Sequence, residues 1–444
     1  MKKTSLYFFL FLLLPSASLY AQSDTSTLEL SLDKAIEIGL QQRYELLNQE
    51  LSIQITQNSR EKTQSANLPQ VKASIDFRYN LALQTNLLPP GFTGSTDYTP
   101  VKFGTPYNTL TAVNVTQNLY NPNVSGDKDI NTTQTEYESL ALEKMKTDIR
   151  LSIATAYYAV LLNKEQVMLN KENLVNVQEI LKKGKAEHAD GVLLKSDLDR
   201  YELDVRNAQS LLTTSERNYD NSIVYLKNQM ALDYDVKIIL TDNLESLTKD
   251  INPNATDNFT AEQRHEYKLE ESQMRINNKQ YHKAGKNYLP TVYLYGNVSI
   301  QNQSASFALF NGNYWYPFSY VGVHADIPIF DGMDKSRTRT DYKLKALQNQ
   351  NNLQRYRKEF YYETINASKE MNNTYSQYMN SKDNYELARQ VMATDQVRYK
   401  EGTITYAALK NTEYSLQNAQ NNYLNSIYNV LIAQLNYQKV TGQL

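Results

Sequence analysis

The clearest feature of the chain is a change in the period of its apolar residues after Pro69. Residues 31–67 carry apolar side chains at helical spacing, with Ser31 placed to cap the first turn. From residue 71 to residue 84 apolar and polar residues alternate, which predicts a strand with one apolar and one polar face. A second strand is predicted over residues 107–120, after a loop rich in Pro, Gly and Thr. The apolar face of the predicted helix consists of Ala35, Ile36, Leu40, Leu47, Leu51 and Ile55.

Helical periodicity then continues over much longer stretches. It predicts a helix from about residue 127 to residue 183, with an interruption at Asn163-Lys164, where the apolar positions shift. The helical pattern resumes after Gly191 and runs to about Met230. Because glycine tolerates a left-handed backbone, Gly191 is predicted at the tip of an antiparallel helical hairpin.

The same series of elements occurs twice. Glu202 corresponds to Glu413, 211 residues later, and Pro69 corresponds to Pro290, 221 residues later. The change in offset falls between the paired strands and makes the first outer loop the longer one, as expected because loops absorb insertions. The chain is therefore an internal duplication of helix, strand, strand, long helix, tip and helix.

The second copy of this unit predicts strands over residues 292–300 and 320–329 and a hairpin tip near Gly402. Neither Gly nor Pro occurs from residue 333 to residue 401. At ~1.5 Å per residue, a helix of roughly sixty residues would extend for about 90 Å. Such lengths predict a rod rather than a globular domain.

The predicted organisation has four parts. Residues 1–21 have the basic start, apolar run and small residues of a signal peptide. Two structural repeats over residues 22–230 and 259–444 are separated by a looser segment at 231–258. No later apolar run reaches the ~18 residues of a spanning helix, so an exported chain of this kind would enter a membrane as a barrel. Four strands cannot close one, since small barrels need about eight, so several subunits must contribute.

Composition excludes several classes of protein. The 444 residues contain 46 basic and 48 acidic side chains, so no polyanionic partner is indicated. The absence of cysteine removes disulfides, thiolate metal sites and cysteine nucleophiles. No phosphate-binding loop or hydrolase motif is present, so we expect neither an enzyme nor a bound cofactor. A metal site is not expected either, because the four histidines lack ligand spacing: His188, His265, His282 and His324.

The chain resembles the TolC-type outer-membrane efflux proteins of Gram-negative bacteria over nearly all of its mature length. The matching features are Leu-Pro before a strand at 68–69 and 289–290, Tyr-Lys-Glu-Gly-Thr at 399–403, the segment 437–444 and the duplicated order. Residues 43–46 read Arg-Tyr-Glu-Leu, where the family usually has Asn-Pro-Glu-Leu.

This resemblance implies a mixed fold, a β-barrel joined to a long α-helical coiled-coil barrel. Each protomer of a homotrimer would give four strands to a twelve-stranded barrel in the outer membrane, and the helices would form a periplasmic tunnel. The implied function is the exit duct of a tripartite efflux or type I secretion system. It would passively conduct substrates from an inner-membrane pump, through a periplasmic adaptor, to the exterior.

The resemblance also assigns roles to individual residues. By position, Asp197 and Tyr399 match a pair that holds the closed tip, although Asp197 would equally suit a solvated first helical turn and Tyr399 an aromatic packing contact. The family's ring of aspartates falls at Ala408 and Asn411, and neither is acidic. An acidic constriction is therefore not expected at those levels. The expected adaptor-binding tips are Gly191, Val192, Leu193, Gly402, Thr403 and Ile404.

A second function class fits the long helices alone, namely an exported coiled-coil protein that tethers the layers of the cell envelope. The alternating segments at 71–84 and 320–329 count against it, because a tether needs no such strands.

Overall fold

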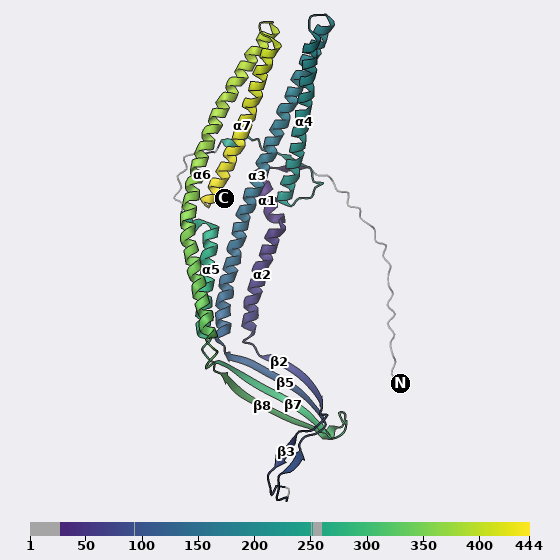
Figure 1. Ribbon diagram of the computed structural model, residues 1–444, viewed down its shortest axis with the longest axis vertical. Coiled ribbons are helices and arrows are strands. Elements are labelled where there is room, and N and C mark those ends of the chain that lie inside the picture. Colours follow the sequence, from purple (N-terminus) through teal and green to yellow (C-terminus); the bar gives the residue numbers. More distant parts are fainter. Residues whose placement is uncertain (1–26, 93, 250, 252–259) are drawn as a thin grey trace, which may run out of the picture.

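The computed structural model describes residues 27–92, 94–249, 251 and 260–444 and shows an elongated molecule with a sheet at one end and helical tips at the other (Figure 1). The predicted signal peptide, residues 1–21, lies outside the described residues, as do residues 250 and 252–258 of the predicted looser segment. No helix in the described ranges combines the length and apolarity needed to cross a membrane.

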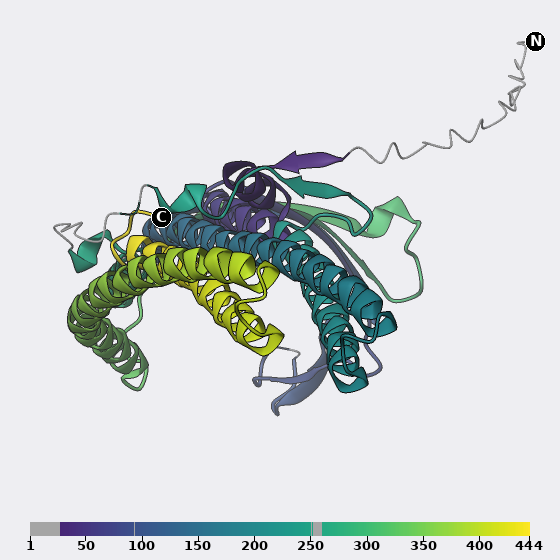
Figure 2. The ribbon, with the colours of Figure 1, turned by 90° about the horizontal axis from the view of Figure 1, so that it is seen from above.

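The seven α-helices of the described residues form a curved layer, which Figure 2 shows from above. The long helices α3 and α6, of 68 and 67 residues, run from the sheet to the two tips. Near the sheet the order across the layer is α2, α3, α5 and α6, and toward the tips it is α4, α3, α7 and α6. The helices are α1 (Leu32–Gln42), α2 (Tyr44–Ser65), α3 (Pro122–Ala189), α4 (Lys195–Met230), α5 (His265–Lys286), α6 (Asp334–Lys400) and α7 (Tyr406–Val440).

Four antiparallel strands form the main sheet, in the order β2, β5, β7 and β8. The edge strands are therefore β2 and β8, and the pairing of β5 with β7 joins the two repeats. The shorter strands form two small sheets: β3 pairs with β4, and β1 pairs in parallel with β6. The strands are β1 (Leu28–Leu30), β2 (Gln70–Tyr79), β3 (Thr85–Leu88), β4 (Thr99–Lys102), β5 (Tyr107–Tyr120), β6 (Ile238–Leu240), β7 (Thr291–Ser304) and β8 (Trp315–Asp326).

Strand register gathers the apolar residues on one face of the main sheet. Val71 pairs with Val115, which pairs with Gly296, which in turn pairs with Val321. Because side chains alternate along a strand, these partners share a face, and Val71 and Val321 are 65% and 76% exposed. The alternation seen in the sequence thus becomes an apolar surface that this single chain leaves open to its surroundings.

The opposite face of the sheet is polar and internally hydrogen bonded. Asn297 Nδ2 donates to Asn114 Oδ1 over 2.7 Å, from β7 to β5. Farther along the same two strands, Gln301 Nε2 donates to Asn108 Oδ1 over 2.9 Å. Cross-strand amide pairs of this kind are stable facing water, so the two faces of the sheet suit different solvents.

The predicted strand at 107–120 is confirmed as β5, the one predicted at 292–300 lies within the longer β7, and the predicted longer first outer loop is also found. Residues 80–106 join β2 to β5, whereas residues 305–314 join β7 to β8. Two predictions need correction at their ends. The first strand stops at residue 79 rather than 84, because the chain turns into the additional hairpin β3–β4. The last strand begins at residue 315 rather than 320 and ends at 326.

Two predictions about the helices are wrong. The single helix expected over residues 31–67 is divided at Arg43, whose backbone is extended (φ −66°, ψ 123°) and whose side chain bonds Glu45 and Gln229. Helix α3 passes through residues 163–164 without interruption. Its apolar residues change phase there because its partners change: Leu161 belongs to the central core, whereas Leu174 packs on α4.

The central core lies where α1, α3, α4, α7 and the β1–β6 pair meet. Helix α1 approaches α3 so closely that a Cβ on Gly39 would lie 2.2 Å from Ile153 Cδ1. Tyr157 is fully buried, and its hydroxyl lies 2.9 Å from Leu30 O and 2.8 Å from Asp242 Oδ2. Asp242 also accepts a hydrogen bond from Leu32 N over 2.9 Å. These bonds tie the segment between the repeats to the first repeat.

We expect Tyr157→Phe to lower the free energy of unfolding by ~1–2 kcal/mol, because Asp242 and the Leu30 carbonyl lose a buried donor. Thermal unfolding followed by circular dichroism would measure this loss. Tyr158→Phe is the matched control, since Tyr158 is also buried but its hydroxyl bonds no described residue. Equal melting temperatures for the two variants would contradict the assigned role of Tyr157.

Candidate functional site

The two helical tips have the same local construction. Gly191 and Gly402 adopt positive φ angles of 76° and 73°, and nothing lies within 4 Å of a Cβ added to either residue. Glycine is thus favoured by the backbone conformation rather than by a lack of space. In each tip the next backbone amide closes the turn: Val192 N donates to Glu187 O, and Thr403 N donates to Arg398 O.

A cleft of about 810 Å³ lies between the tip of the first hairpin, α3–α4, and that of the second, α6–α7. Residues from both hairpins line it, so the fold brings together parts of the chain about 200 residues apart (roughly the repeat spacing). Of the predicted site residues, Gly191, Thr403 and Ala408 are not part of this lining. The predicted site residues that line it are Val192, Leu193, Asp197, Tyr399, Gly402, Ile404 and Asn411.

Asp197 and Tyr399 face the same cleft but have other partners. Asp197 Oδ1 lies 3.4 Å from Arg200 Nη1 within α4. The ring of Tyr399 lies 5.4 Å below the ammonium group of Lys183 and 6.2 Å from the ring of Tyr406. Within the described residues, no hydrogen bond joins Asp197 to Tyr399.

A buried group of charges connects the hairpins beside this pair. The hydroxyl of Tyr406, the first residue of α7, donates to Asp204 Oδ2 of α4 over 2.8 Å. Lys410 Nζ lies 3.8 Å from the same carboxylate oxygen and 3.0 Å from Glu413 Oε2. The side chains of Asp204, Lys410 and Glu413 are only 14%, 11% and 8% exposed. We call Asp204, Tyr406, Lys410 and Glu413 the gate cluster.

Aromatic packing shields the gate cluster from water. The ring of Tyr201 meets that of Tyr406 edge to face, with 4.2 Å between centroids. Tyr201 fits because α3 has Gly184 opposite, where a Cβ would come within 2.4 Å of the ring. Burial, followed by the bond to Asp204, raises the pKa of Tyr406, so its hydroxyl stays protonated and remains a donor.

The gate cluster is stable because each charge in it has a partner. Lys410 lies between two carboxylates, and Asp204 receives a hydroxyl hydrogen bond in addition. Removing one partner from a buried ion pair leaves the other charge desolvated and unpaired, which is strongly destabilising. The contact between the hairpins at this level therefore depends on paired polar side chains and on the ring contact of Tyr201 with Tyr406.

The contact between Asp204 and Tyr406 is not among the expectations from the sequence. The sequence nevertheless carries one signal for it. Asp204 lies seven residues after Asp197, and Tyr406 lies seven residues after Tyr399. A spacing of seven places residues on the same face of a coiled-coil helix, two turns farther along. The hydroxyl–carboxylate contact of the structure therefore lies one heptad farther from the tips than the pair suggested by resemblance.

The positions expected at the constriction are uncharged and exposed in this chain: Ala408 and Asn411. In the described part of the chain, no three side chains of the His, Cys, Asp and Glu types are grouped as metal ligands would be.

Residues 262–443 match the family model of outer membrane efflux proteins, which confirms the resemblance that the sequence suggests. The matched family is one of efflux proteins, which are transport proteins rather than enzymes. No curated protein matches the sequence significantly.

Solved outer membrane proteins share the fold over more than nine-tenths of the chain. A structure of CusC, described for its folding and transmembrane channel formation, is 15% identical with a TM-score of 0.73, covering 96% of this chain and 95% of CusC. The CmeC channel of Campylobacter jejuni is 15% identical with a TM-score of 0.73, covering 93% of this chain and 85% of its own. The outer membrane protein VceC of Vibrio cholerae is 15% identical with a TM-score of 0.65, covering 93% and 96%.

We expect Lys410→Met to separate the two tips, because it leaves Asp204 and Glu413 without their cation. Breaking a fully buried pair costs ~3–5 kcal/mol, and the remaining exposure of this cluster reduces that cost. The chain has no cysteine, so Leu203→Cys and Ala407→Cys would place two unique thiols across the cleft. The rate of cross-linking by a short bifunctional maleimide would report the separation.

Lys400→Met is the matched control for this experiment. Lys400 lines the same cleft but pairs with no described carboxylate, so its loss changes the net charge equally and unpairs nothing. A cross-linking rate that falls equally in both variants would show that the effect is one of net charge and would remove the gate cluster from the contact.

Proposed function

We propose that this chain is one protomer of an outer-membrane channel that serves as the exit duct of a tripartite efflux or type I secretion system. One observation carries the proposal: a sheet with an open apolar face and two unpaired edges continues directly into a curved layer of long helices. The family match and the shared fold support it. Such a channel conducts substrates passively, from an inner-membrane pump to the exterior.

The internal duplication supports closure into a ring of identical copies. Within the chain, β5 of the first repeat pairs with β7 of the second, so the equivalent pairing joins β8 to β2 of the next copy. The helices follow the same rule, because α3 contacts α5 and α7, and α6 would contact α2 and α4 of the next copy. Leu47, Leu51 and Ile55 of α2 are 42%, 53% and 66% exposed and would be covered there. Three copies give the twelve strands of the proposed homotrimer.

The proposed location is the outer membrane of a Gram-negative bacterium, with the helices in the periplasm. The four main strands have 10, 14, 14 and 12 residues. A tilted strand of ~9–11 residues spans a bilayer core, so these lengths suffice. The apolar face of the sheet would contact lipid, and the polar face with its amide pairs would line the water-filled passage.

The tips are the proposed contact with a periplasmic adaptor. Val192 and Leu194 are 80% and 70% exposed, and exposed apolar residues at the end of a long hairpin favour a protein partner. The proposed contact residues are those expected from the sequence, Gly191, Val192, Leu193, Gly402, Thr403 and Ile404. The inner-membrane pump would join the channel through this adaptor.

The gate cluster is the proposed closure of the resting channel, with Asp197 and Tyr399 as a second latch on the same cleft. The gate cluster joins the two hairpins, which must separate for the tunnel to widen. Tyr399 of the second hairpin also lies against Lys183 of the first. Ala408 and Asn411 would line the constriction without negative charge, so closure rests on contacts between helices rather than on a ring of carboxylates.

Purified trimer in planar bilayers tests this function. The wild-type protein should form channels of low resting conductance, and Tyr406→Phe with Lys410→Met should raise that conductance severalfold by freeing the second hairpin. Asp197→Ala with Tyr399→Phe tests the second latch in the same way. Divalent cations should block only weakly, because the constriction positions lack carboxylates. A protein that forms no channels would refute the proposed function.

The sheet provides a separate test of membrane insertion. Arginine at Ile75, on the apolar face, should cost ~2–4 kcal/mol near the bilayer midplane and prevent assembly, whereas arginine at Ser74, on the opposite face, should be tolerated. Migration of unheated and heated samples on gels would distinguish assembled trimer from monomer. If both variants assembled equally well, the apolar face would not contact lipid.

A further inference from the structure

The segment between the two repeats crosses the helical layer and bonds a different helix at every third residue. We call residues 241–249 the equatorial strap. Asp242 bonds Tyr157 of α3, as described above. Glu245 Oε1 accepts a hydrogen bond from Tyr423 of α7 over 3.2 Å, and the hydroxyls of Thr248 and Tyr378 of α6 are hydrogen bonded over 3.2 Å. The strap therefore connects the first hairpin to both helices of the second.

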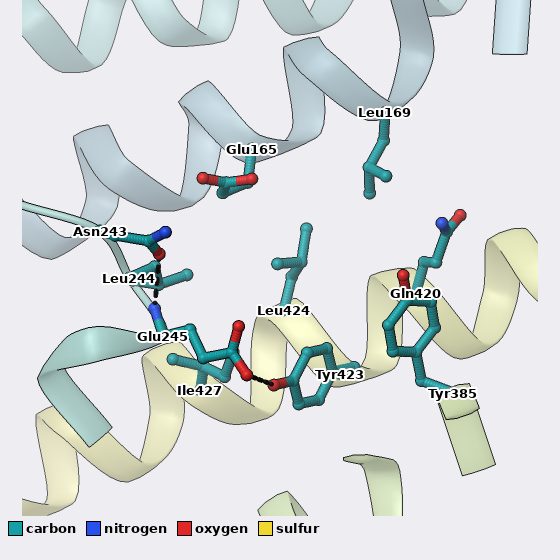
Figure 3. A pocket seen from close by; sticks show the side chains of 10 residues that line it. All are labelled: Glu165, Leu169, Asn243, Leu244, Glu245, Tyr385, Gln420, Tyr423, Leu424 and Ile427. Atoms are coloured by element: carbon teal, nitrogen blue, oxygen red, sulfur yellow. Dashed lines mark hydrogen bonds between the residues drawn. The ribbon is translucent and has the colours of Figure 1, made fainter. Parts of the chain in front are cut away.

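The strap holds the second hairpin as a unit. Tyr423 of α7 stacks on two rings of α6, Tyr378 at 6.0 Å and Tyr385 at 5.3 Å between centroids. Its hydroxyl points to the Glu245 carboxylate, as Figure 3 shows. The backbone of the strap is anchored beside this bond, because Leu244 is 1% exposed in the central core. A shift of Tyr423 relative to Glu245 would thus move α6 and α7 together.

Between the strap and the gate cluster, the two hairpins are separated by a groove of about 800 Å³. Residues 166–176 of α3 and 413–425 of α7 contribute to its lining, which is rich in Asn and Gln. The hairpins are therefore joined at two levels, at the strap and at the tip, with a polar groove between. If the tip contact breaks, the strap remains as the point about which the second hairpin turns.

A cavity of about 180 Å³ beside the Glu245–Tyr423 bond gives this movement room. It lies between the strap, α3 and α7, and Glu165 and Leu424 line it from opposite sides (Figure 3). Burial raises the pKa of Glu165; the charge of Lys164 opposes this rise and that of Glu245 adds to it. A space of this size beside the bond leaves α7 room to shift relative to the strap.

Helix geometry converts a small shift at the strap into a large one at the gate cluster. Tyr406 precedes Tyr423 by 17 residues on α7. At ~1.5 Å per residue this is about 25 Å, so a rotation of roughly 10° at the strap moves Tyr406 by about 4 Å. A displacement of that size breaks the hydrogen bond between Tyr406 and Asp204.

We propose that Glu245 and Thr248 are positioning residues of the gate: by holding Tyr423 and Tyr378 they set the resting angle of the second hairpin and so keep the gate cluster closed. The inference rests on the proposed function only in treating the tip as a gate. The mechanical coupling between strap and tip is a property of the protein itself and can be measured without transport.

The test uses the thiol pair Leu203→Cys and Ala407→Cys in the full-length trimer, with cross-linking by a short bifunctional maleimide at 25 °C. Glu245→Leu and Tyr423→Phe each remove the strap bond and should lower the cross-linking rate at the tip severalfold. Glu245→Gln should keep the wild-type cross-linking rate, because its amide oxygen still accepts a hydrogen bond from the Tyr423 hydroxyl. Tyr428→Phe is the control: it also removes a tyrosine hydroxyl from α7, but this hydroxyl bonds no described residue. The cross-linking rate of this variant should stay within twofold of wild type.

The outcomes distinguish a positioning role of the strap from a merely stabilising one. They also separate the failure of this inference from the failure of the proposed function. If Glu245→Leu and Tyr423→Phe lower only the melting temperature and leave the cross-linking rate unchanged, the strap is merely structural and the proposal is overturned. Conductance measured on the same variants should rise severalfold when cross-linking falls. If cross-linking responds as expected but no variant or wild-type protein forms channels, the coupling stands and the proposed function fails.

Discussion

The apolar core around Tyr157 packs α7 of the second repeat against α1, α3 and α4 of the first, and the alignment of the long helices depends on it. Long helices have few contacts per unit length with anything but their neighbours, so their alignment must be fixed at some level. Here α1, α3, α4 and α7 and the strap segment meet in one apolar core, and the Tyr157 hydroxyl and Asp242 fix the register within it. Above this level the hairpins contact each other through polar side chains, which allows them to separate.

The chain uses two kinds of contact for two purposes. The central core is apolar and would be costly to open, since each buried aliphatic side chain contributes ~1.5–3 kcal/mol. The gate cluster consists of charges and a hydroxyl, which water can solvate when the tips part. The apolar core therefore holds the helices together permanently in the middle of the molecule. The paired charges allow the contact between the tips to break and form again. At the other end of the molecule, the sheet has an open apolar face and two free edges. A single chain supplies neither the apolar solvent nor the partner strands that these need.

Much of the fold could be predicted from the sequence because its elements are long and strongly periodic. The period of two fixed the strand over residues 107–120, and glycine at positive φ fixed both tips. Internal duplication then gave the order of the remaining elements. The break at Arg43 and the continuity of α3 through residues 163–164 could not be predicted, because each depends on which helices lie beside the segment. When the apolar positions of a helical pattern shift in phase, the helix can either end there or continue and pack against a different neighbouring helix.

The sequence by itself determined the repeats, the tips and the absence of acidic residues at Ala408 and Asn411. Only the tertiary structure decided which polar residues meet across the hairpins. Asp204 and Tyr406 are about 200 residues apart, and so are Asp197 and Tyr399, so sequence spacing does not distinguish the two pairs. The choice depends on how far the hairpins lie apart at each level, which the core at the equator and the bulk of Tyr201 against Gly184 set. Distances between elements arise from packing, and packing is a property of the assembled fold.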